Sequence, residues 1–423
     1  MSFPVKTKDS RSAWFFWSLG ALFFFTHYIV RVSTSVITAD LMHDFAITAA
    51  ELGKLSGFFY VGYLFMQMPA GFFLDRFGPR LLLAFAAICC GSSALMLSLS
   101  SNITEVYFAR LFFGLVAAFA FVGSIKLARA WFTPKHLGLV IGLTQGMGML
   151  GAAAGNGPLS HLVSNIGWRP SLQLVAIALL LLGALIAIFV RNHPANLDPK
   201  ADDIIDHTPK PKLWNYIAQV LWCRYTWFNA LYAGLIYAPV EVFGELWGVS
   251  FLVGVHNITH AEAARAGSLI FLGWFCGGPL FGWLADQIGR RPTMLISAVA
   301  GLIIVPTLIY ATGLTALHIA IIMFIFGLSN AGLIAAYTVA GEMHPEHSTG
   351  LSLGITNMIS VIIGACLQPV IGLLINFYWD GQYLNGVPSY SAEAFQSAMR
   401  ILPLCPLLAL ICALCLRETL KKD

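Results

Sequence analysis

Charged residues are scarce in this chain of 423 residues. They make up 10% of it, whereas hydrophobic residues make up 58%. A soluble globular protein carries roughly 25% charged residues, because its surface has to be covered by groups that water solvates. The shortage of charge therefore excludes an ordinary soluble domain and predicts a polytopic membrane protein.

The sequence also lacks the patterns that mark catalytic and cofactor sites. None of the eight cysteines shows metal-ligand spacing, and all but Cys223 lie within apolar runs, so we interpret them as small apolar residues. No Gly-Lys-Ser/Thr loop for a phosphate and no haem-attachment pair is present. We therefore expect no metal, no cofactor, no enzymatic activity and no nucleic-acid partner. Work on a solute would have to come from a solute or ion gradient.

Apolar runs of about 20 residues, the length that a membrane-spanning helix needs, occur twelve times. We predict helices over 13–37, 50–73, 79–99, 103–128, 137–161, 170–190, 222–250, 265–286, 292–312, 315–340, 350–376 and 396–416. The segment 191–213 is rich in Pro and charge and cannot cross a bilayer. The sequence thus predicts an all-α membrane protein with an N-terminal six-helix bundle (1–190), a linker (191–213) and a C-terminal six-helix bundle (214–423).

The distribution of Lys and Arg predicts the orientation of these helices. With the N-terminus in the cytoplasm, most of the 24 basic residues fall in cytoplasmic segments. The few that remain, such as Arg31 and Arg110, fall inside helices or on the outside. Both termini are therefore expected in the cytoplasm.

A ten-residue stretch occurs twice in the chain. The first copy is GFFLDRFGPR (71–80) and the second is GWLADQIGRR (282–291). In each copy a Gly is followed by an Asp, a second Gly and basic residues at the same spacing, and each copy lies between two apolar runs. Two copies half a chain apart indicate an internal duplication. Asp75 and Asp286 can cap helix ends and pair with nearby Arg side chains.

These two copies resemble the loops between helices 2 and 3 and between helices 8 and 9 of major facilitator superfamily transporters. The resemblance covers essentially the whole chain and implies two pseudo-symmetric six-helix bundles that transport by alternating access. It also implies that the loops form a latch that holds the cytoplasmic side together. The implied latch residues are Gly71, Asp75, Arg76, Gly78, Arg80, Gly282, Asp286, Gly289, Arg290 and Arg291. Lys126 and Arg129 are expected partners. Pro79 and Gln287 replace usually basic positions, which predicts a weaker latch there. The alternative is that the loop charges only set the topology.

Further stretches narrow the resemblance to one branch of the superfamily. RVSTSVITADL, FLDRFGPR and GGPLFGWLADQIGRRP are similar to a bacterial branch that is distantly related to lysosomal dipeptide carriers and to nutrient-uptake carriers. The resemblance implies a monomer in a bacterial inner membrane. Proton-driven drug antiporters of the superfamily carry a Gly-Pro in the middle of helix 5. Here Gly157-Pro158 lies near the outer end, which counts against drug efflux.

Two basic side chains on the first predicted helix are candidate solute ligands. His27 and Arg31 are four residues apart and so lie on one helix face. A guanidinium can hold a carboxylate through two parallel hydrogen bonds. The alternative is that Arg31 extends to the outer lipid headgroups. Several organic-anion carriers of the superfamily use an Arg on helix 1. The resemblance also links Arg110, on the fourth predicted helix, to proton coupling.

Glu241 and Glu245 lie four residues apart on the seventh predicted helix. Two carboxylates on one face within a membrane should not both ionise, so one of them could carry a proton or bind an ammonium group of the solute. The alternative is a helix broken near Pro239, Gly244 and Gly248, which would leave both carboxylates in a watery outer vestibule. Further candidate solute ligands are Tyr63, Tyr237, Asn330 and Tyr337.

Together these patterns predict proton-coupled uptake of a small zwitterionic or carboxylate-bearing solute, such as an amino acid, a short peptide, an organic acid or a siderophore. The expected partners are the solute, protons and the lipid bilayer. Efflux or facilitated uniport of another small organic solute is one alternative. A non-transporting membrane receptor on the same fold is another.

Overall fold

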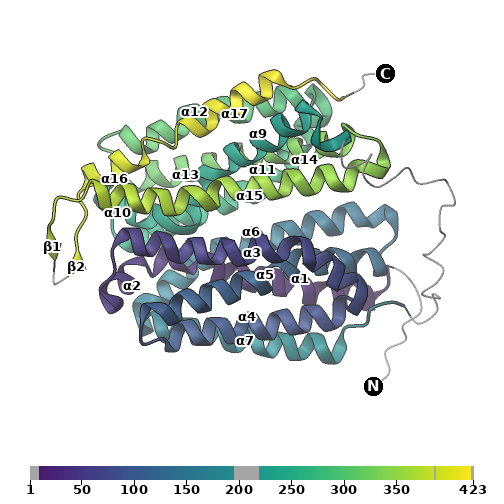
Figure 1. The fold of residues 1–423 in the computed structure, drawn as a ribbon, viewed down its shortest axis with the longest axis horizontal. Helices are drawn as coiled ribbons and strands as arrows, with labels where there is room; N and C mark the ends of the chain where they lie inside the picture. Colours follow the sequence, from purple (N-terminus) through teal and green to yellow (C-terminus); the bar gives the residue numbers. More distant parts are fainter. Residues whose placement is uncertain (1–8, 195–218, 385–386, 421–423) are drawn as a thin grey trace. The chain divides into compact units, whose positions relative to one another are not determined.

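The computed structural model describes residues 9–194, 219–384 and 387–420, and most of these residues are helical (Figure 1). Eleven helices among them are long and apolar enough to cross a membrane, or twelve if the bent stretch Ala49–Phe77 counts as one span. The all-α membrane fold expected from the apolar runs is therefore confirmed. Most of the expected linker, 191–213, lies outside the described residues.

The contacts between residues divide the chain into two compact units. Unit 1 comprises Met1–Ser33 and Phe58–Thr208, and unit 2 comprises Thr34–Gly57 and Pro209–Asp423. Two of these boundaries fall inside helices, so α1 (Arg11–Val36) and α3 (Ala49–Phe77) each contribute to both units. The domain boundaries expected from the linker, 1–190 and 214–423, stay a prediction. The assignment of 34–57 to unit 2 is a feature that no sequence pattern indicated.

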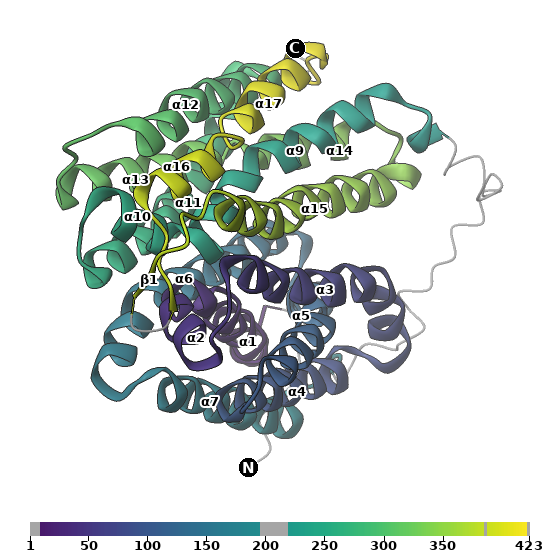
Figure 2. The ribbon, with the colours of Figure 1, turned by 60° about the vertical axis from the view of Figure 1, so that its left-hand side comes forward.

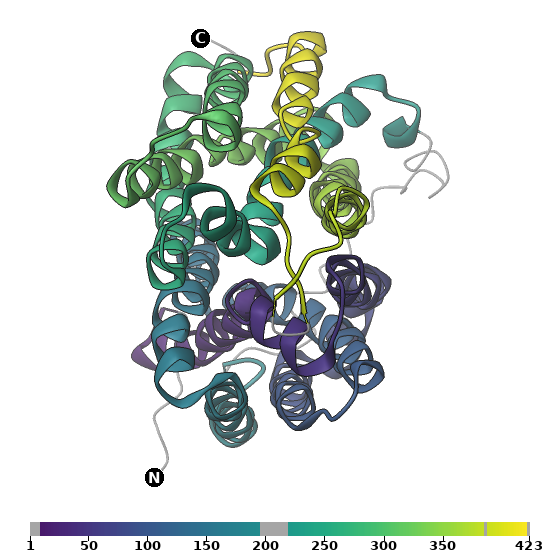
Figure 3. The same cartoon turned by 90° about the vertical axis from the view of Figure 1, so that its left-hand side faces the viewer.

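Unit 1 is completed by four long helices, each expected from an apolar run. They are α4 (Pro79–Leu99), α5 (Ile103–Trp131), α6 (Pro134–Ile166) and α7 (Trp168–Phe189). α4 and α7 lie side by side in Figures 1 and 2. Within unit 1 most long helices run along a common direction, and Figure 3 views several of them nearly end-on.

Unit 2 contains the remaining elements. They are α2 (Thr38–Phe45), α9 (Arg224–Val242), the π-helix η1 (Phe243–Trp247), α10 (Gly248–His256), α11 (His260–Ile288), α12 (Arg290–Tyr310), α13 (Ala316–Asn330), α14 (Leu333–Glu342), α15 (Glu346–Phe377), β1 (Tyr383–Leu384), β2 (Val387–Pro388), α16 (Ala392–Met399) and α17 (Leu404–Cys415). β1 and β2 pair as a small antiparallel hairpin. α17 packs against α9 and α12, as Figure 2 shows.

Local chemistry explains where several of these helices begin. Pro79 occupies the first turn of α4, where its missing N–H has no intrahelical partner to lose. The side chain of Asn102 accepts a hydrogen bond from the backbone N–H of Glu105 at the start of α5. Thr259 and Glu262 form a reciprocal capping box at the start of α11.

Three predicted helices differ from a single straight span. The run predicted over 315–340 is divided into α13 and α14 by a turn at Ala331 and Gly332. The run over 396–416 is divided into α16 and α17 just before Pro403 and Leu404. α3 bends by 53° between Gln67 and Pro69, since a proline inside a helix cannot donate the regular main-chain hydrogen bond.

Close approach of helices in unit 1 depends on glycine. A Cβ atom added to Gly114 of α5 would collide with the carbonyl oxygen of Phe59 on α3, and one added to Gly62 of α3 would collide with the carbonyl oxygen of Leu111 on α5. The two backbones therefore touch at a reciprocal pair of glycines. This contact places the Phe59 turn of α3 directly beside α5.

Candidate functional site

Arg31 lies in an aromatic cage within unit 1. Its guanidinium carbon is 5.1, 5.5, 5.6 and 5.8 Å from the ring centroids of Tyr28, Phe59, Tyr60 and Tyr63. The guanidinium also donates to the hydroxyls of Tyr28 and Tyr60, each at 3.4 Å. The side chain is only 4% exposed, so it does not extend over the lipid-facing surface. A ring facing a desolvated guanidinium contributes about 2 kcal/mol, and such contacts offset part of the cost of burying this charge.

Arg110 holds the backbone of α1 at the cage. Its guanidinium donates to the carbonyl oxygens of Val30 and Arg31, at 3.2 and 3.4 Å. Its guanidinium carbon lies 5.1 Å from the ring centroid of Phe59, the same ring that faces Arg31. Arg110 therefore positions the residue that carries the caged guanidinium.

His27 is packed rather than open. Its Nδ1 lies 2.8 Å from the carbonyl oxygen of Phe24, so Nδ1 carries the proton and donates it. The imidazole stacks on the rings of Phe24 and Phe113, with centroids 5.3 and 6.2 Å apart. At 1% exposure, this side chain contributes to the wall of the cage one turn before Arg31.

Glu241 and Glu245 lie on a helical path that stays continuous from α9 through η1 to α10. The structure differs from the broken-helix alternative, because both side chains are buried, with 0% and 4% exposure. The π turn introduces the irregularity instead, and such turns are frequent at functional sites. A Cβ added to Gly364 of α15 would collide with the carboxylate of Glu241. That carboxylate therefore lies directly against α15.

Three further predicted ligands also lie in unit 2. Tyr237 is buried one turn before Glu241. Asn330 donates its amide hydrogen to the carbonyl oxygen of Ile236. Tyr337 of α14 forms a small polar cluster with α15 that is only partly buried.

In this cluster the hydroxyl of Tyr337 lies 3.0 Å from Oδ1 of Asn357 and 3.2 Å from Oγ of Ser360. The side chains of Tyr337 and Asn357 keep partial exposure within spanning helices. Polar groups exposed at membrane depth usually face water-filled space rather than lipid. The cluster can therefore exchange hydrogen bonds with a hydroxylated solute.

Sequence reasoning missed several members of these sites. Tyr28 and Phe59 were not candidates, although Tyr28 precedes Arg31 by one helical turn. That spacing is a usable signal for Tyr28. No comparable signal identifies Phe59, since a Phe in an apolar run is usually a packing residue.

The first copy of the repeated loop carries one ion pair. Nζ of Lys126 lies 2.5 Å from Oδ1 of Asp75 and donates to the carbonyl oxygen of Leu74 at 2.6 Å. This ion pair lines a cavity with a volume of about 440 Å³, and Arg129 and His193 line the same cavity. The expected partners Lys126 and Arg129 thus both lie beside this loop. Gly71, the first residue of the copy, also lines the cavity.

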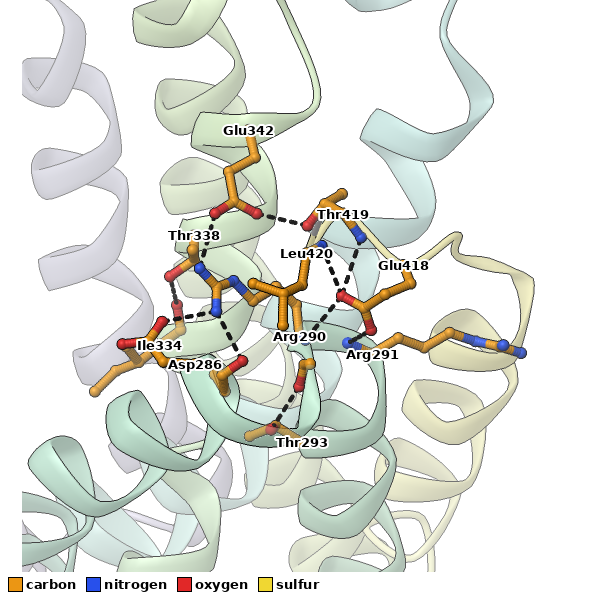
Figure 4. Close-up of polar contacts among 12 residues, drawn as sticks. Asp286, Arg290, Arg291, Thr293, Ile334, Thr338, Glu342, Glu418, Thr419 and Leu420 are labelled. Atoms are coloured by element: carbon orange, nitrogen blue, oxygen red, sulfur yellow. Dashed lines mark hydrogen bonds and ion pairs between the residues drawn. The ribbon is translucent and has the colours of Figure 1, made fainter. Parts of the chain in front are cut away.

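The second copy carries a larger network, drawn in Figure 4. The Arg290 guanidinium lies 2.7 Å from Asp286 and 2.9 Å from Glu342. The Glu418 carboxylate accepts the backbone N–H groups of Arg290 and Arg291, each at 3.0 Å. Thr419 donates its hydroxyl to the second oxygen of Glu342 at 2.6 Å. The C-terminal segment thus ties the loop to the end of α14.

The Glu418 carboxyl also has a shifted pKa. Partial burial alone would raise this pKa, but hydrogen bonds from the backbone N–H groups of Leu420, Arg290, Arg291 and Thr419 outweigh burial and lower it. Glu418 therefore stays ionised at neutral pH. Its negative charge lies at the N-terminus of α12, where the helix dipole favours an anion.

The two copies share one design. Gly78 and Gly289, with φ of 78° and 109°, occupy the left-handed region that favours glycine. A new helix begins directly after each of these glycines, α4 in the first copy and α12 in the second. The first turn of that helix donates a backbone N–H to a side chain that lies three residues past the end of α7 or of α17. This residue is Asn192 in the first half and Glu418 in the second. The guanidinium of Arg80 donates to a carbonyl oxygen of α7, and the guanidinium of Arg291, at the equivalent position of the second copy, donates to a carbonyl oxygen of α17.

One of the differences between the copies changes the ion pairs at the loop. Pro79 stands where the second copy has Arg290, so the first loop lacks the guanidinium that joins Asp286 to Glu342. Arg76, another expected latch residue, stacks on Phe77 at 5.7 Å. A Cβ added to Gly282 meets nothing within 4 Å. Gly282 is therefore not required for close packing within the described residues.

Comparison with known proteins agrees with this architecture. The pattern of the Major Facilitator Superfamily matches residues 19–369. The probable galactarate/D-glucarate transporter GudP of Bacillus subtilis (strain 168) is 22% identical over 396 residues, covering 87% of each chain. The probable 4-methylmuconolactone transporter of Cupriavidus pinatubonensis is 26% identical over 353 residues, covering 80% of this chain and 78% of that one.

Among solved structures, a bacterial homologue of the human lysosomal transporter Spinster, in an inward-facing and unoccupied conformation, superposes with a TM-score of 0.80. The two chains are 17% identical, and the superposition covers 96% of this chain and 97% of that one. At this identity the likeness shows the fold alone. Because the match to the family pattern extends over most of the chain, the chain belongs to the Major Facilitator Superfamily.

Proposed function

We propose that this transporter is a secondary active carrier that takes up a small hydroxylated carboxylate, a sugar acid, together with protons. The observation that carries the proposal is the buried guanidinium of Arg31 among tyrosine hydroxyls. A guanidinium buried at membrane depth is costly and usually functional. It matches a carboxylate through two parallel hydrogen bonds.

Sugar acids suit the chemistry of both units better than amino acids or peptides. Arg31 offers the charge for a carboxylate, and the hydroxyls of Tyr28 and Tyr60 beside it can hydrogen-bond to neighbouring hydroxyls. The cluster of Tyr337 and Asn357 offers further donors and acceptors. The relative named for galactarate and D-glucarate supports the same class of solute.

Glu241 and Glu245 are the proposed sites of proton coupling. Both carboxylates are buried in the spanning path of α9 and η1. Protonation removes the charge that burial disfavours, so proton binding can be linked to the transport cycle. Arg110, which the family resemblance linked to coupling, acts in this proposal by holding α1 through the carbonyl oxygens of Val30 and Arg31.

The remaining features of the proposal concern placement. We infer a bacterial inner membrane, with both termini and both repeated loops in the cytoplasm, because Lys and Arg gather there. α3 begins at Ala49 and reaches the first repeated loop at its other end, so its first turns face the outside. The protein acts as a monomer in the lipid bilayer.

The test is uptake of radiolabelled D-glucarate into proteoliposomes with an imposed proton gradient, compared with D-glucuronate, citrate and diglycine. Arg31→Gln should lower kcat/KM by about tenfold to a hundredfold, the loss expected for charged hydrogen bonds. Arg265→Gln is the matched control, because Arg265 is exposed and its guanidinium donates to the carbonyl oxygen of Ala261 on its own helix. Uptake by Arg31→Gln at the rate of the unsubstituted protein would refute the assignment.

A second arm tests the coupling. Glu241→Gln should retain exchange of labelled for unlabelled D-glucarate but lose accumulation driven by the proton gradient. D-glucarate uptake down its own gradient that is unchanged by both this substitution and a protonophore would favour uniport. Binding of D-glucarate without any translocation would favour a receptor.

A further inference from the structure

Gln368 of α15 connects three elements within unit 2. Its Nε2 donates to the carbonyl oxygen of Glu241 at 2.9 Å, and its Oε1 accepts the hydroxyl hydrogen of Ser56 on α3. Its backbone carbonyl oxygen accepts the indole hydrogen of Trp247, the last residue of η1, at 2.9 Å. The side chain is fully buried. One residue therefore joins the main chain beside a candidate proton site to the outer end of α3.

The same stretch of α15 packs on the outer turns of α3. A Cβ atom added to Gly53 would lie 3.0 Å from Cα of Pro369, and one added to Gly57 would lie 3.4 Å from Cγ of the same proline. Gly372, one turn further on, meets the carbonyl oxygen of Ala49. A methyl group would be tight at Gly53 and would collide with backbone at Gly372, whereas it would make an ordinary contact at Gly57. The contact is therefore a close one, and the bond from Ser56 to Gln368 lies at its centre.

A second contact fixes the end of α1 in unit 2. Nε2 of His260 lies 2.9 Å from the carbonyl oxygen of Val36 and donates to it. Thr34–Gly57 thus belongs with unit 2, although the rest of α1 and α3 belongs with unit 1. A segment that belongs to one unit while the rest of its helices belongs to the other is suited to act as a hinged element.

We propose that Gln368 is the positioning residue of an outer gate formed by Thr34–Gly57 on unit 2. Its Oε1 holds the gate closed through Ser56, and its Nε2 fixes the main chain that carries Glu241. Gate closure and placement of this carboxylate then depend on one amide, so that movement of α9 and release of α3 are linked. The coupling half of this inference rests on the function proposed above, whereas the gate half does not.

The gate can be tested without any solute. Ser35, on the same segment, is 1% exposed, and its hydroxyl has no hydrogen-bond partner among the described residues. Ser35→Cys therefore serves as a reporter, with a membrane-impermeant maleimide applied to intact cells and the protein without this cysteine as the blank. Ser56→Ala in this background should raise the labelling rate about fivefold, the population change expected from loss of one average hydrogen bond. Ser56→Thr, which keeps the hydroxyl, should label at the rate of the background.

A double-mutant cycle isolates the bond itself. Gln368→Ala should also raise labelling, and adding Ser56→Ala to it should have no further effect, because both substitutions remove the same contact. Additive effects would overturn the proposal, as would equal labelling of Ser56→Ala and Ser56→Thr. Acceleration seen only in inverted vesicles would place the segment on the cytoplasmic side and overturn an outer gate. Expression and gel-filtration profiles identify any variant that fails to fold.

Transport kinetics test the link to Glu241. Ser56→Ala should lower KM for external D-glucarate by up to about fivefold, because a larger fraction of the protein is open to the outside. Gln368→Ala should in addition lower kcat, since it also releases the carbonyl of Glu241. Equal kcat for the two variants would overturn the link. Faster labelling combined with no D-glucarate transport by any variant, the unsubstituted protein included, would refute the solute assignment and leave the gate supported.

Discussion

Removing the Glu418 carboxylate should destabilise unit 2 in a pH-dependent way. Glu418→Ala deletes the acceptor for the first two N–H groups of α12, both at 3.0 Å. Loss of such a cap costs about 1 kcal/mol, and the charge at a helix N-terminus contributes up to about 1 kcal/mol more at an exposed site. Because this residue is largely exposed, we expect a total near 1 kcal/mol. If a bundle of about 200 residues unfolds as one unit, the midpoint should fall by about 2 °C.

The sign of the pH dependence follows from the lowered pKa of Glu418. A carboxyl whose folded pKa lies below its unfolded value contributes stability above the unfolded pKa, and this contribution is lost as pH falls through the folded pKa. The difference in stability between the unsubstituted protein and Glu418→Gln should therefore be full at neutral pH, start to fall near the unfolded pKa of a glutamate, and be lost as the pH falls through the lower folded pKa of Glu418. The assay is intrinsic-fluorescence melting of the detergent-purified protein across this range.

Asn192 supplies the matched control for this experiment. It accepts the backbone N–H of Arg80 at 2.9 Å at the start of α4, but it carries no charge. Asn192→Ala should therefore lower the midpoint by a similar amount at every pH. A Glu418→Ala variant that melts like the unsubstituted protein at neutral pH would refute the capping argument. A cost of Glu418→Gln that persists unchanged in acid would refute the charge argument.

Three further predictions concern packing, the latch and the solute. Gly114→Ala should destabilise the protein by about 1–3 kcal/mol, as overpacking does, because the added methyl group would collide with the carbonyl oxygen of Phe59. Thermal melting measures this loss, and an unchanged midpoint would contradict the close approach of α3 and α5. Arg290→Gln removes two ion pairs and should reduce uptake more than Arg76→Gln, which removes a contact with the ring of Phe77. Equal uptake by both variants would contradict the difference between the two loops. Tyr337→Phe should raise KM for D-glucarate about fivefold, the effect of losing one hydrogen bond, and should change KM little for an acid without hydroxyls, such as succinate. An equal change in KM for both acids would contradict a contact between Tyr337 and a solute hydroxyl.

Most spans could be predicted from the sequence because a bilayer imposes a length on every helix. The predicted run 79–99 coincides with α4, and several other predicted ends lie within a few residues of the observed ones. The turn between α13 and α14 was not predicted, although 328–333 contains Ser, Asn and Gly, because the apolar run on both sides is long enough to read as a single span. That turn brings Gly332 against the side chain of Ser297 on α12, a contact that only the tertiary structure supplies. The short helix α2 was missed for a different reason, because at eight residues it is too short to span a membrane.

The candidate site divides in the same way. Arg31 and Glu241 could be identified because an ionisable residue in an apolar run is rare and costly. The aromatic cage and the role of Gln368 could not, because Phe59 and Gln368 become significant only through the helices that they face. Glu418 was missed because nothing in the last residues of the chain indicates that they return to the N-terminus of α12. Sequence therefore identifies charges that need an explanation, whereas packing shows which neutral groups explain them.

The unequal repeats have a consequence for how the two halves hold their loops. In the second half Arg290 joins Asp286 to Glu342, and Thr419 binds the other oxygen of Glu342, so loop, α14 and C-terminal segment form one network. In the first half Pro79 replaces the arginine, and the ion pair between Lys126 and Asp75 leaves Asp75 largely exposed. Exposed pairs contribute less than about 1 kcal/mol, whereas linked charges act together. The duplication has therefore kept the backbone design at both loops but concentrated the electrostatic connections in the second.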